Sequence, residues 1–333
     1  MKTALSVILF TVLSGAGLGA LALAALAELW AHLRGAPPAW SAAMTAATAI
    51  ALVLVIAGLC ASTLHLANPR NAWRSLTRWR TSWLSREALL ALVLVPLAAV
   101  YVGLHAVDRD ELTPVLALPV VLLGWGLLYC TAMIYASLKP VPQWHTARVP
   151  LAFLLIGHAS GALLIVSAVA TARPIGDAWI VTATALFVAA LIAKLEYWRF
   201  VGGRGIPMER AIGVPHGVAP PRRAGAPLQS VAARLLDVGH SKGTFLTDEF
   251  VVTHAASMRQ AMRAVALLAG FGIPLLWLAT AGIPLPGLGD GRADWHIAAI
   301  AWLACMAGFT AERWLFFAEA RHVVRLYHGD RTT

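Results

Sequence analysis

Two residues that can exchange protons stand at the ends of one polar connection in the sequence. His65 closes an apolar run, and Glu87, 22 residues later, opens the next one. Because the connection returns the chain to the same edge of the apolar region, both side chains are expected at similar depth, bordering one pocket. An imidazole and a carboxylate together can pass protons at neutral pH. The alternative is that His65 caps a helix and Glu87 pairs with Arg86 or Arg80 at the headgroups.

The connection itself, HLANPRNAWRSLTRWRTSWLSREALL, is unusually rich in arginine and tryptophan. Arg70, Arg74 and Arg78 recur every four residues, which would form one basic stripe on an α-helix. The three tryptophans are Trp73, Trp79 and Trp83. A short interfacial helix, with indoles in the headgroup zone and arginines outward, explains this pattern. Partner contact at Arg70, Trp73, Arg74, Arg78 and Trp79 and simple lipid anchoring both remain open.

The elements that position these residues are expected to be membrane-spanning helices. Of the 333 residues, 59% are hydrophobic and 13% charged, whereas a soluble domain has about 25% charged residues. Apolar runs recur at the length of about 20 residues that crosses a bilayer. The first run exceeds the apolar core of about 7–15 residues in a signal peptide, so it is taken as a span. The expected fold is all-α, a polytopic bundle of eight transmembrane helices at about 5–29, 42–66, 88–107, 112–137, 150–171, 175–198, 261–283 and 293–317.

Basic residues are distributed unevenly about these eight spans. All but Arg34, Arg109, Arg173 and Arg292 of the 26 lysines and arginines fall on the side that also holds both termini. Lys194 and Arg313 are included in that basic side. The asymmetry predicts cytoplasmic termini and a cytoplasmic basic face. A docking surface for an acidic partner would produce the same bias.

Three parts follow along the chain. Residues 1–198 form a six-helix bundle with the candidate site, and residues 261–333 form a two-helix hairpin with a tail. Between them, residues 199–260 are basic and rich in glycine and proline in their first half. This loop is interpreted as a partner-docking segment, with Phe245 and Phe250 as contact residues; an unstructured loop with a helical end is the alternative.

Other spans carry a histidine, cysteines and small residues. His158 lies within the fifth span, and with His65 it could form a haem-ligating pair, although no haem is expected. Cys60, Cys130 and Cys305 stand singly, without a CxxC, so no iron–sulfur or zinc motif is present and no metal ligand is assigned. Glycines in the first and fifth spans, among them Gly19 and Gly157, predict close helix approach.

Three stretches of the sequence resemble the membrane-anchor subunit family of dimethyl sulfoxide reductase (DmsC-like). They are FTVLSGAGLGALAL, HLANPRNAWRSLTRWRTSWLSREALL and TFLTDEFVVTHAASMRQAMR, and the resemblance covers essentially the whole chain. It implies an anchor that itself holds no haem, iron–sulfur cluster or molybdenum. The partners implied are an iron–sulfur subunit with [4Fe–4S] clusters and a molybdopterin catalytic subunit. The resemblance places the family's quinone-site histidine and glutamate on His65 and Glu87; Asp248 departs from the pattern, where a basic residue is expected.

The charge bias refines this resemblance. A basic face predicted to be cytoplasmic resembles the sulfite-oxidising (SoeC-like) branch, whose catalytic subunits stay in the cytoplasm. We therefore expect quinone, ubiquinone or menaquinone, at a site of His65, Glu87, Arg80, Arg86, Trp83 and His158 in a bacterial cytoplasmic membrane. The chain itself would contribute no catalytic residue for the molybdenum substrate. Lipid is the other expected partner, and nucleic acid is not expected.

Three rival functions remain from other classes or branches. A reductase-type anchor would oxidise quinol and send electrons the other way. A secondary transporter would show inverted repeats and broken helices with charges at the midplane, and no obvious repeat is visible. A purely structural anchor would leave the quinone site to its partner.

Overall fold

The structure, a computed structural model, is all-helical in the part of the chain that it describes. It describes residues 4–35, 41–64, 69–109, 111–171, 176–203, 205, 255–281, 295–328 and 333. The helices are α1 (Leu5–Leu33), α2 (Ala42–Thr63), the 3₁₀ helix η1 (Pro69–Arg78), α3 (Trp83–Ala106), α4 (Thr113–Ala136), α5 (Arg148–Ala170), α6 (Asp177–Gly202), α9 (Ala256–Leu267), the π-helical turn η2 (Leu268–Gly272), α10 (Ile273–Ala281), α11 (Trp295–Ala318) and the 3₁₀ helix η3 (Val323–His328).

Seven of these helical runs are long and apolar enough to cross a membrane, which makes the chain a polytopic membrane protein. They are α1 to α6 and the continuous run Ala256–Ala281 that joins α9, η2 and α10. Eight spans were predicted. The remaining helix, α11, has 24 residues, a spanning length, but it also carries His296, Glu312 and Arg313 and is not among the seven.

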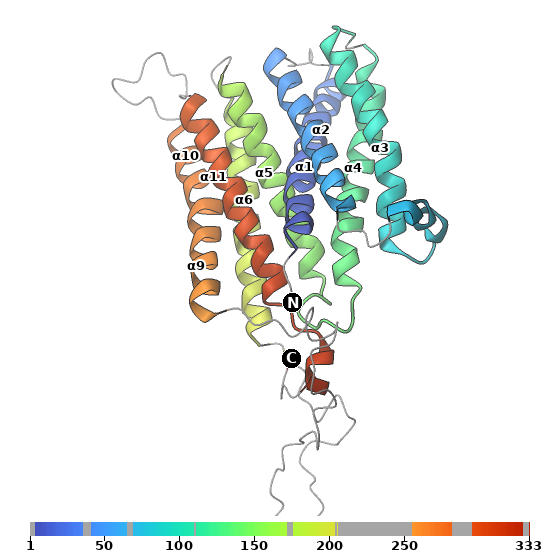
Figure 1. The fold of residues 1–333 in the computed structure, drawn as a ribbon. Coiled ribbons are helices and arrows are strands. Elements are labelled where there is room, and N and C mark those ends of the chain that lie inside the picture. Colours follow the sequence, from blue (N-terminus) through green and yellow to red (C-terminus); the bar gives the residue numbers. More distant parts are fainter. Residues whose placement is uncertain are drawn as a thin grey trace, which may run out of the picture.

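Successive long helices alternate in direction, and α11 lies alongside the others (Figure 1). As a result, the beginning of α1 and the end of α11 lie at the same end of the bundle (Figure 1). The turn from η1 to α3 belongs to this end too, because α3 starts there. We refer to it as the η1 end. The turn between α3 and α4 marks the opposite end.

The two central helices are α1 and α5, because 78% of the apolar window of each is buried, against 28% for α3 and α6. Glycines permit their close approach, as the sequence predicted. A Cβ at Gly19 would overlap the backbone of Gly157, and one at Gly161 would overlap the backbone of Gly19 and Ala20. Backbone-to-backbone packing of this kind is typical of helix pairs in membranes.

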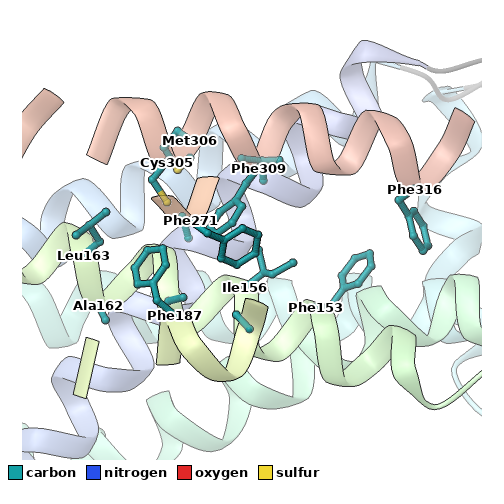
Figure 2. Packing of buried hydrophobic residues seen from close by; sticks show 14 of the residues in the cluster. Phe153, Ile156, Ala162, Leu163, Phe187, Phe271, Cys305, Met306, Phe309 and Phe316 are labelled. Carbon is teal, nitrogen blue, oxygen red and sulfur yellow. The ribbon is translucent and has the colours of Figure 1, made fainter. Parts of the chain in front are cut away.

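The second part of the core joins the C-terminal helices to this centre. Figure 2 shows Phe187 of α6, Phe271 of η2 and Phe309 of α11 facing one another, with Phe153 of α5 near Phe316. The Phe187 and Phe309 rings are stacked with centroids 6.2 Å apart. The aromatic layer fixes α11 against α5 and α6 and therefore makes the C-terminal hairpin part of one bundle.

Candidate functional site

Glu87 lies one turn into α3, at the η1 end of the bundle. The Ser82 hydroxyl accepts a hydrogen bond from the Ser85 amide at 3.4 Å, which caps the helix and starts it at Trp83, five residues before the expected start. Helical spacing then places Glu87 on the same face as the buried residues Ala91 and Leu94. The glutamate is 5% exposed, so a carboxyl group lies inside the bundle near its end.

The partner of this carboxyl group is a hydroxyl on the neighbouring helix. Thr131 Oγ1 of α4 donates a hydrogen bond to Glu87 Oε1, and it also lies 3.0 Å from the carbonyl oxygen of Leu127. Glu87 Oε2 forms no hydrogen bond with any described residue. Sequence reasoning missed Thr131, because a threonine within an apolar run has no spacing relation to a glutamate on another helix.

Arg86 does not pair with Glu87. Its Nε–H donates to the carbonyl oxygen of Trp79 at 2.9 Å, and Nη2 donates to that of Arg80 at 2.8 Å. Its guanidinium also lies 4.2 Å from the centre of the Trp83 ring. The alternative pairing of Glu87 with Arg86 or Arg80 is therefore not formed, and Arg86 instead ties the turn between η1 and α3 together.

An aromatic pair begins one helical turn before the glutamate, at Trp83. Trp83 meets Tyr129 of α4 edge-on, with ring centroids 5.8 Å apart, and Tyr129 is 41% exposed. Arg80 lies 5.3 Å from the Trp79 ring, so the η1-to-α3 turn is built from alternating guanidinium and indole groups. Tyr135, one turn further along α4 from Thr131, is buried and packs against Trp144.

His158 is held apart from this group. Its Nδ1 lies 2.7 Å from the Leu154 carbonyl oxygen, and its Nε2 accepts a hydrogen bond from Trp125 Nε1 at 2.8 Å. Because an indole nitrogen can only donate, the imidazole is neutral with its proton on Nδ1. Trp125 precedes Thr131 by six residues on α4, which is about 9 Å along the helix. Both ring nitrogens are thus hydrogen-bonded, and the imidazole lies deeper in the bundle than Glu87.

The arginines of η1 do not form the predicted stripe. A 3₁₀ helix turns by about 120° per residue, so residues four apart point in different directions. Arg70, Arg74 and Arg78 are therefore spread around η1, although all three are exposed, as are Trp73 (61%) and Trp79 (49%). The prediction of a helical, outward-facing basic segment is confirmed, whereas that of one stripe is wrong.

Three predicted site residues, His65, Phe245 and Phe250, lie outside the described residues. Of the other predicted site residues, Trp79 and Arg80 lie in the turn between η1 and α3. Trp83, Arg86 and Glu87 lie at the start of α3, and His158 is separate from them.

A charged cluster inside the helical bundle was also missed. Lys194 Nζ of α6 lies 2.5 Å from Glu312 Oε1 of α11, and Arg313 Nε lies 2.8 Å from Glu312 Oε2. The three side chains are 1–3% exposed. Lys194 and Arg313 were predicted to belong to the basic face. Instead they are buried, and Glu312 on α11 pairs with both and compensates their charge. Their position inside apolar runs was the available signal.

A third buried carboxylate lies at the opposite end. Glu28 of α1 accepts hydrogen bonds from Tyr101, at 2.5 Å, and from Thr113, and it contacts His105 Nε2 at 3.3 Å. These partners come from α3 and α4, so the group joins three helices. Glu28 was not singled out from the sequence either.

The comparisons with known proteins agree with this architecture. Residues 1–318 match the family model described as DMSO reductase anchor subunit (DmsC). The chain is also 33% identical to the sulfite dehydrogenase C-subunit of Allochromatium vinosum, over 98% of this chain and 99% of that protein. The match to the family model covers nearly the whole chain. This chain belongs to the DmsC family of DMSO reductase anchor subunits.

Proposed function

We propose that this subunit exchanges electrons between an iron–sulfur partner and membrane quinone, with Glu87 as the proton-carrying group of the quinone site. Its complex would contain an iron–sulfur subunit and a molybdopterin catalytic subunit. The observation that carries the proposal is Glu87, a buried carboxyl group near one end of the bundle with a single hydroxyl partner among the described residues. An ionisable group so placed in a membrane protein is expected to have a function.

The residues around Glu87 fit a quinone headgroup. Such a ring needs a proton-exchanging group, flat apolar walls and access from lipid. Glu87 Oε2 provides the first, and the edge-on pair of Trp83 and Tyr129, with Tyr129 partly exposed, provides the second and third. Arg86 adds positive charge one residue away, and His65 is expected to complete the site as a hydrogen-bond donor. When bound, quinone supplies the two-electron, two-proton chemistry that no side chain here provides.

Electrons would enter from a partner subunit that docks on the η1 end of the bundle. The exposed Arg70, Arg74 and Arg78 with Trp73 and Trp79 offer charge and aromatic area beside the Glu87 turn, and such residues are enriched at protein interfaces. A partner docked there would hold its terminal iron–sulfur cluster close to the candidate quinone site. We propose the same end as the cytoplasmic one, with α11 as the eighth span and both termini in the cytoplasm of a bacterium.

The name of the relative favours one direction of electron flow. The protein from Allochromatium vinosum is named as part of a sulfite dehydrogenase, which favours sulfite oxidation and quinone reduction here. A reductase-type anchor, which oxidises quinol, is the runner-up because the family model is that of the DMSO reductase anchor. Supplying the purified complex with sulfite and oxidised quinone, or with dimethyl sulfoxide and quinol, separates the two. Reduction of quinone by sulfite supports the first, and turnover only with quinol and dimethyl sulfoxide overturns it.

The decisive variant for the site is Glu87→Gln. Removing a positioned proton-transfer group lowers turnover by roughly 100- to 10,000-fold. We expect a loss in that range for quinone-coupled turnover, with electron transfer from substrate to an artificial acceptor at the partner subunits unchanged. Glu196→Gln is the matched control, because Glu196 is 54% exposed on α6 and pairs only with Arg199 among the described residues. Equal rates for Glu87→Gln and Glu196→Gln would reject the assignment.

A further inference from the structure

Thr131 has two hydrogen-bond acceptors and one hydrogen. Its Oγ1 contacts Glu87 Oε1 and the carbonyl oxygen of Leu127, the latter at 3.0 Å. A hydroxyl group carries a single proton and two lone pairs. It can therefore donate to one of these oxygens at a time, and its own oxygen remains able to accept. Thr131 is 2% exposed, so water does not readily replace either partner.

This arrangement satisfies Glu87 Oε1 in each protonation form of the glutamate. When Glu87 is ionised, or carries its proton on Oε2, the Thr131 hydroxyl donates to Oε1. When the proton is on Oε1, Glu87 donates to Thr131 Oγ1, and the threonine hydrogen turns to the Leu127 carbonyl. In an apolar interior an unsatisfied polar group is costly. A partner that reverses from donor to acceptor removes that cost for Oε1 in every form.

We propose that Thr131 is a positioning residue that holds the Glu87 carboxyl group in place through Oε1 and keeps that oxygen hydrogen-bonded whether the carboxyl group has gained or lost its proton. The proposal rests on the proposed function of Glu87. In the proton balance, Glu87 would take a proton from bulk water at the η1 end and would give it up to a bound quinone as electrons from the partner reduce that quinone, which returns Glu87 to the carboxylate. The threonine proton only changes direction, so the residue acts through Glu87.

Three substitutions test this pair. Thr131→Val removes the hydroxyl but keeps the shape, and Thr131→Ser keeps the hydroxyl. Thr48→Val is the matched control: Thr48 is fully buried in α2, and its hydroxyl bonds only to backbone carbonyls of its own helix among the described residues. Retention of the partner subunits and the thermal midpoint of the complex report whether each variant is folded.

The first readout is the infrared carbonyl band of the protonated Glu87 carboxyl group, identified as the band lost in Glu87→Gln. The frequency and intensity of this band are measured as the pH of the whole complex is changed, in the absence of quinone turnover. In Thr131→Val the band should shift and persist to higher pH, because the carboxylate has lost its donor. Thr131→Ser and Thr48→Val should resemble the wild type. An unchanged band in Thr131→Val, or a change shared by Thr131→Ser, overturns the proposal.

The second readout is the pH profile of turnover with a soluble quinone analogue. Thr131→Val should lower the rate about tenfold at neutral pH, the equivalent of one hydrogen bond to a charged group, and should move the profile in the direction of the infrared titration. An infrared change with an unchanged turnover profile supports the Thr131–Glu87 pair and refutes Glu87 as the proton donor in the proposed function. The two claims can thus fail separately.

Discussion

Three carboxylates are buried in the part of the chain that the structure describes, and they differ in how completely their charge is compensated. Glu312 contacts two cations, Lys194 and Arg313, and Glu28 contacts Tyr101, Thr113 and His105. Glu87 has one hydroxyl partner among the described residues. A group with many fixed partners stabilises one charge state, whereas a group with a single adaptable partner can change state at low cost. The contrast favours structural roles for Glu28 and Glu312 and a functional one for Glu87.

This contrast predicts losses of stability of different size for two substitutions of the same kind. Glu28→Gln weakens hydrogen bonds from α3 and α4 and leaves a buried amide among donors. It should destabilise the protein by about 2–4 kcal/mol, since bonds to a charged group contribute about 1.5–3 kcal/mol. Glu87→Gln keeps an acceptor for Thr131 and should cost less than about 1 kcal/mol. Thermal unfolding in detergent measures both. A larger loss for Glu87→Gln would show that Glu87 is the structural carboxylate.

At the residue scale, the sequence predicted Glu87 near one end of the bundle but not its hydrogen-bond partner. Two apolar runs joined by a polar connection were enough to expect Glu87 at the start of a helix. Its burial depends on the Ser82 cap, which begins α3 earlier than hydropathy suggested. Thr131, 44 residues away on α4, becomes its partner only through the packing of α3 against α4. Such pairings between helices produce no periodic residue spacing that could be recognised in a single sequence.

At the scale of elements, the pair of α6 and α11 depends on one carboxylate. Glu312→Gln leaves Lys194 and Arg313 buried without an anion and close enough to repel, so it should destabilise the bundle by about 3–5 kcal/mol. Lys194→Met leaves the Glu312–Arg313 contact at 2.8 Å and should cost much less. The thermal unfolding midpoints of the two variants, measured beside the wild type, show which substitution destabilises the protein more. A greater loss in Lys194→Met would mean that the lysine, not the glutamate, organises the cluster.

Element prediction succeeded where composition decides and failed where backbone geometry decides. Glycines at matching depth in the first and fifth runs correctly predicted a close α1–α5 contact. The arginine spacing in 70–78 assumed 3.6 residues per turn, but η1 has the 3₁₀ period, so the stripe disappears. The charges that form the α6–α11 cluster lower the hydropathy of α11, which explains why a helix of spanning length falls outside the seven apolar spans.

At the scale of the whole molecule, the two ends of the bundle differ in chemistry. The η1 end has the exposed arginines and tryptophans, Glu87 and the buried cluster of α6 and α11. The opposite end has Glu28 with its three partners and the exposed Arg109. The beginning of α1 and the end of α11 both lie at the η1 end (Figure 1), which requires an even number of passes. This parity is the structural support for counting α11 as a span.

Cysteine labelling tests the proposed orientation directly. Cys60 is exposed and is first replaced by alanine, while Cys130 and Cys305 are buried and stay. Arg74→Cys then marks the η1 end, and Arg109→Cys marks the opposite end, where the side chain of Arg109 is 67% exposed. In inverted vesicles a membrane-impermeant maleimide should label Arg74→Cys and spare Arg109→Cys, because arginine-rich connections stay in the cytoplasm. Right-side-out vesicles should give the reverse. The opposite pattern would place Glu87 at the periplasmic surface, so that quinone there would exchange protons with the periplasm and the partner subunits would have to dock outside the cell membrane, as expected of the reductase-type anchor.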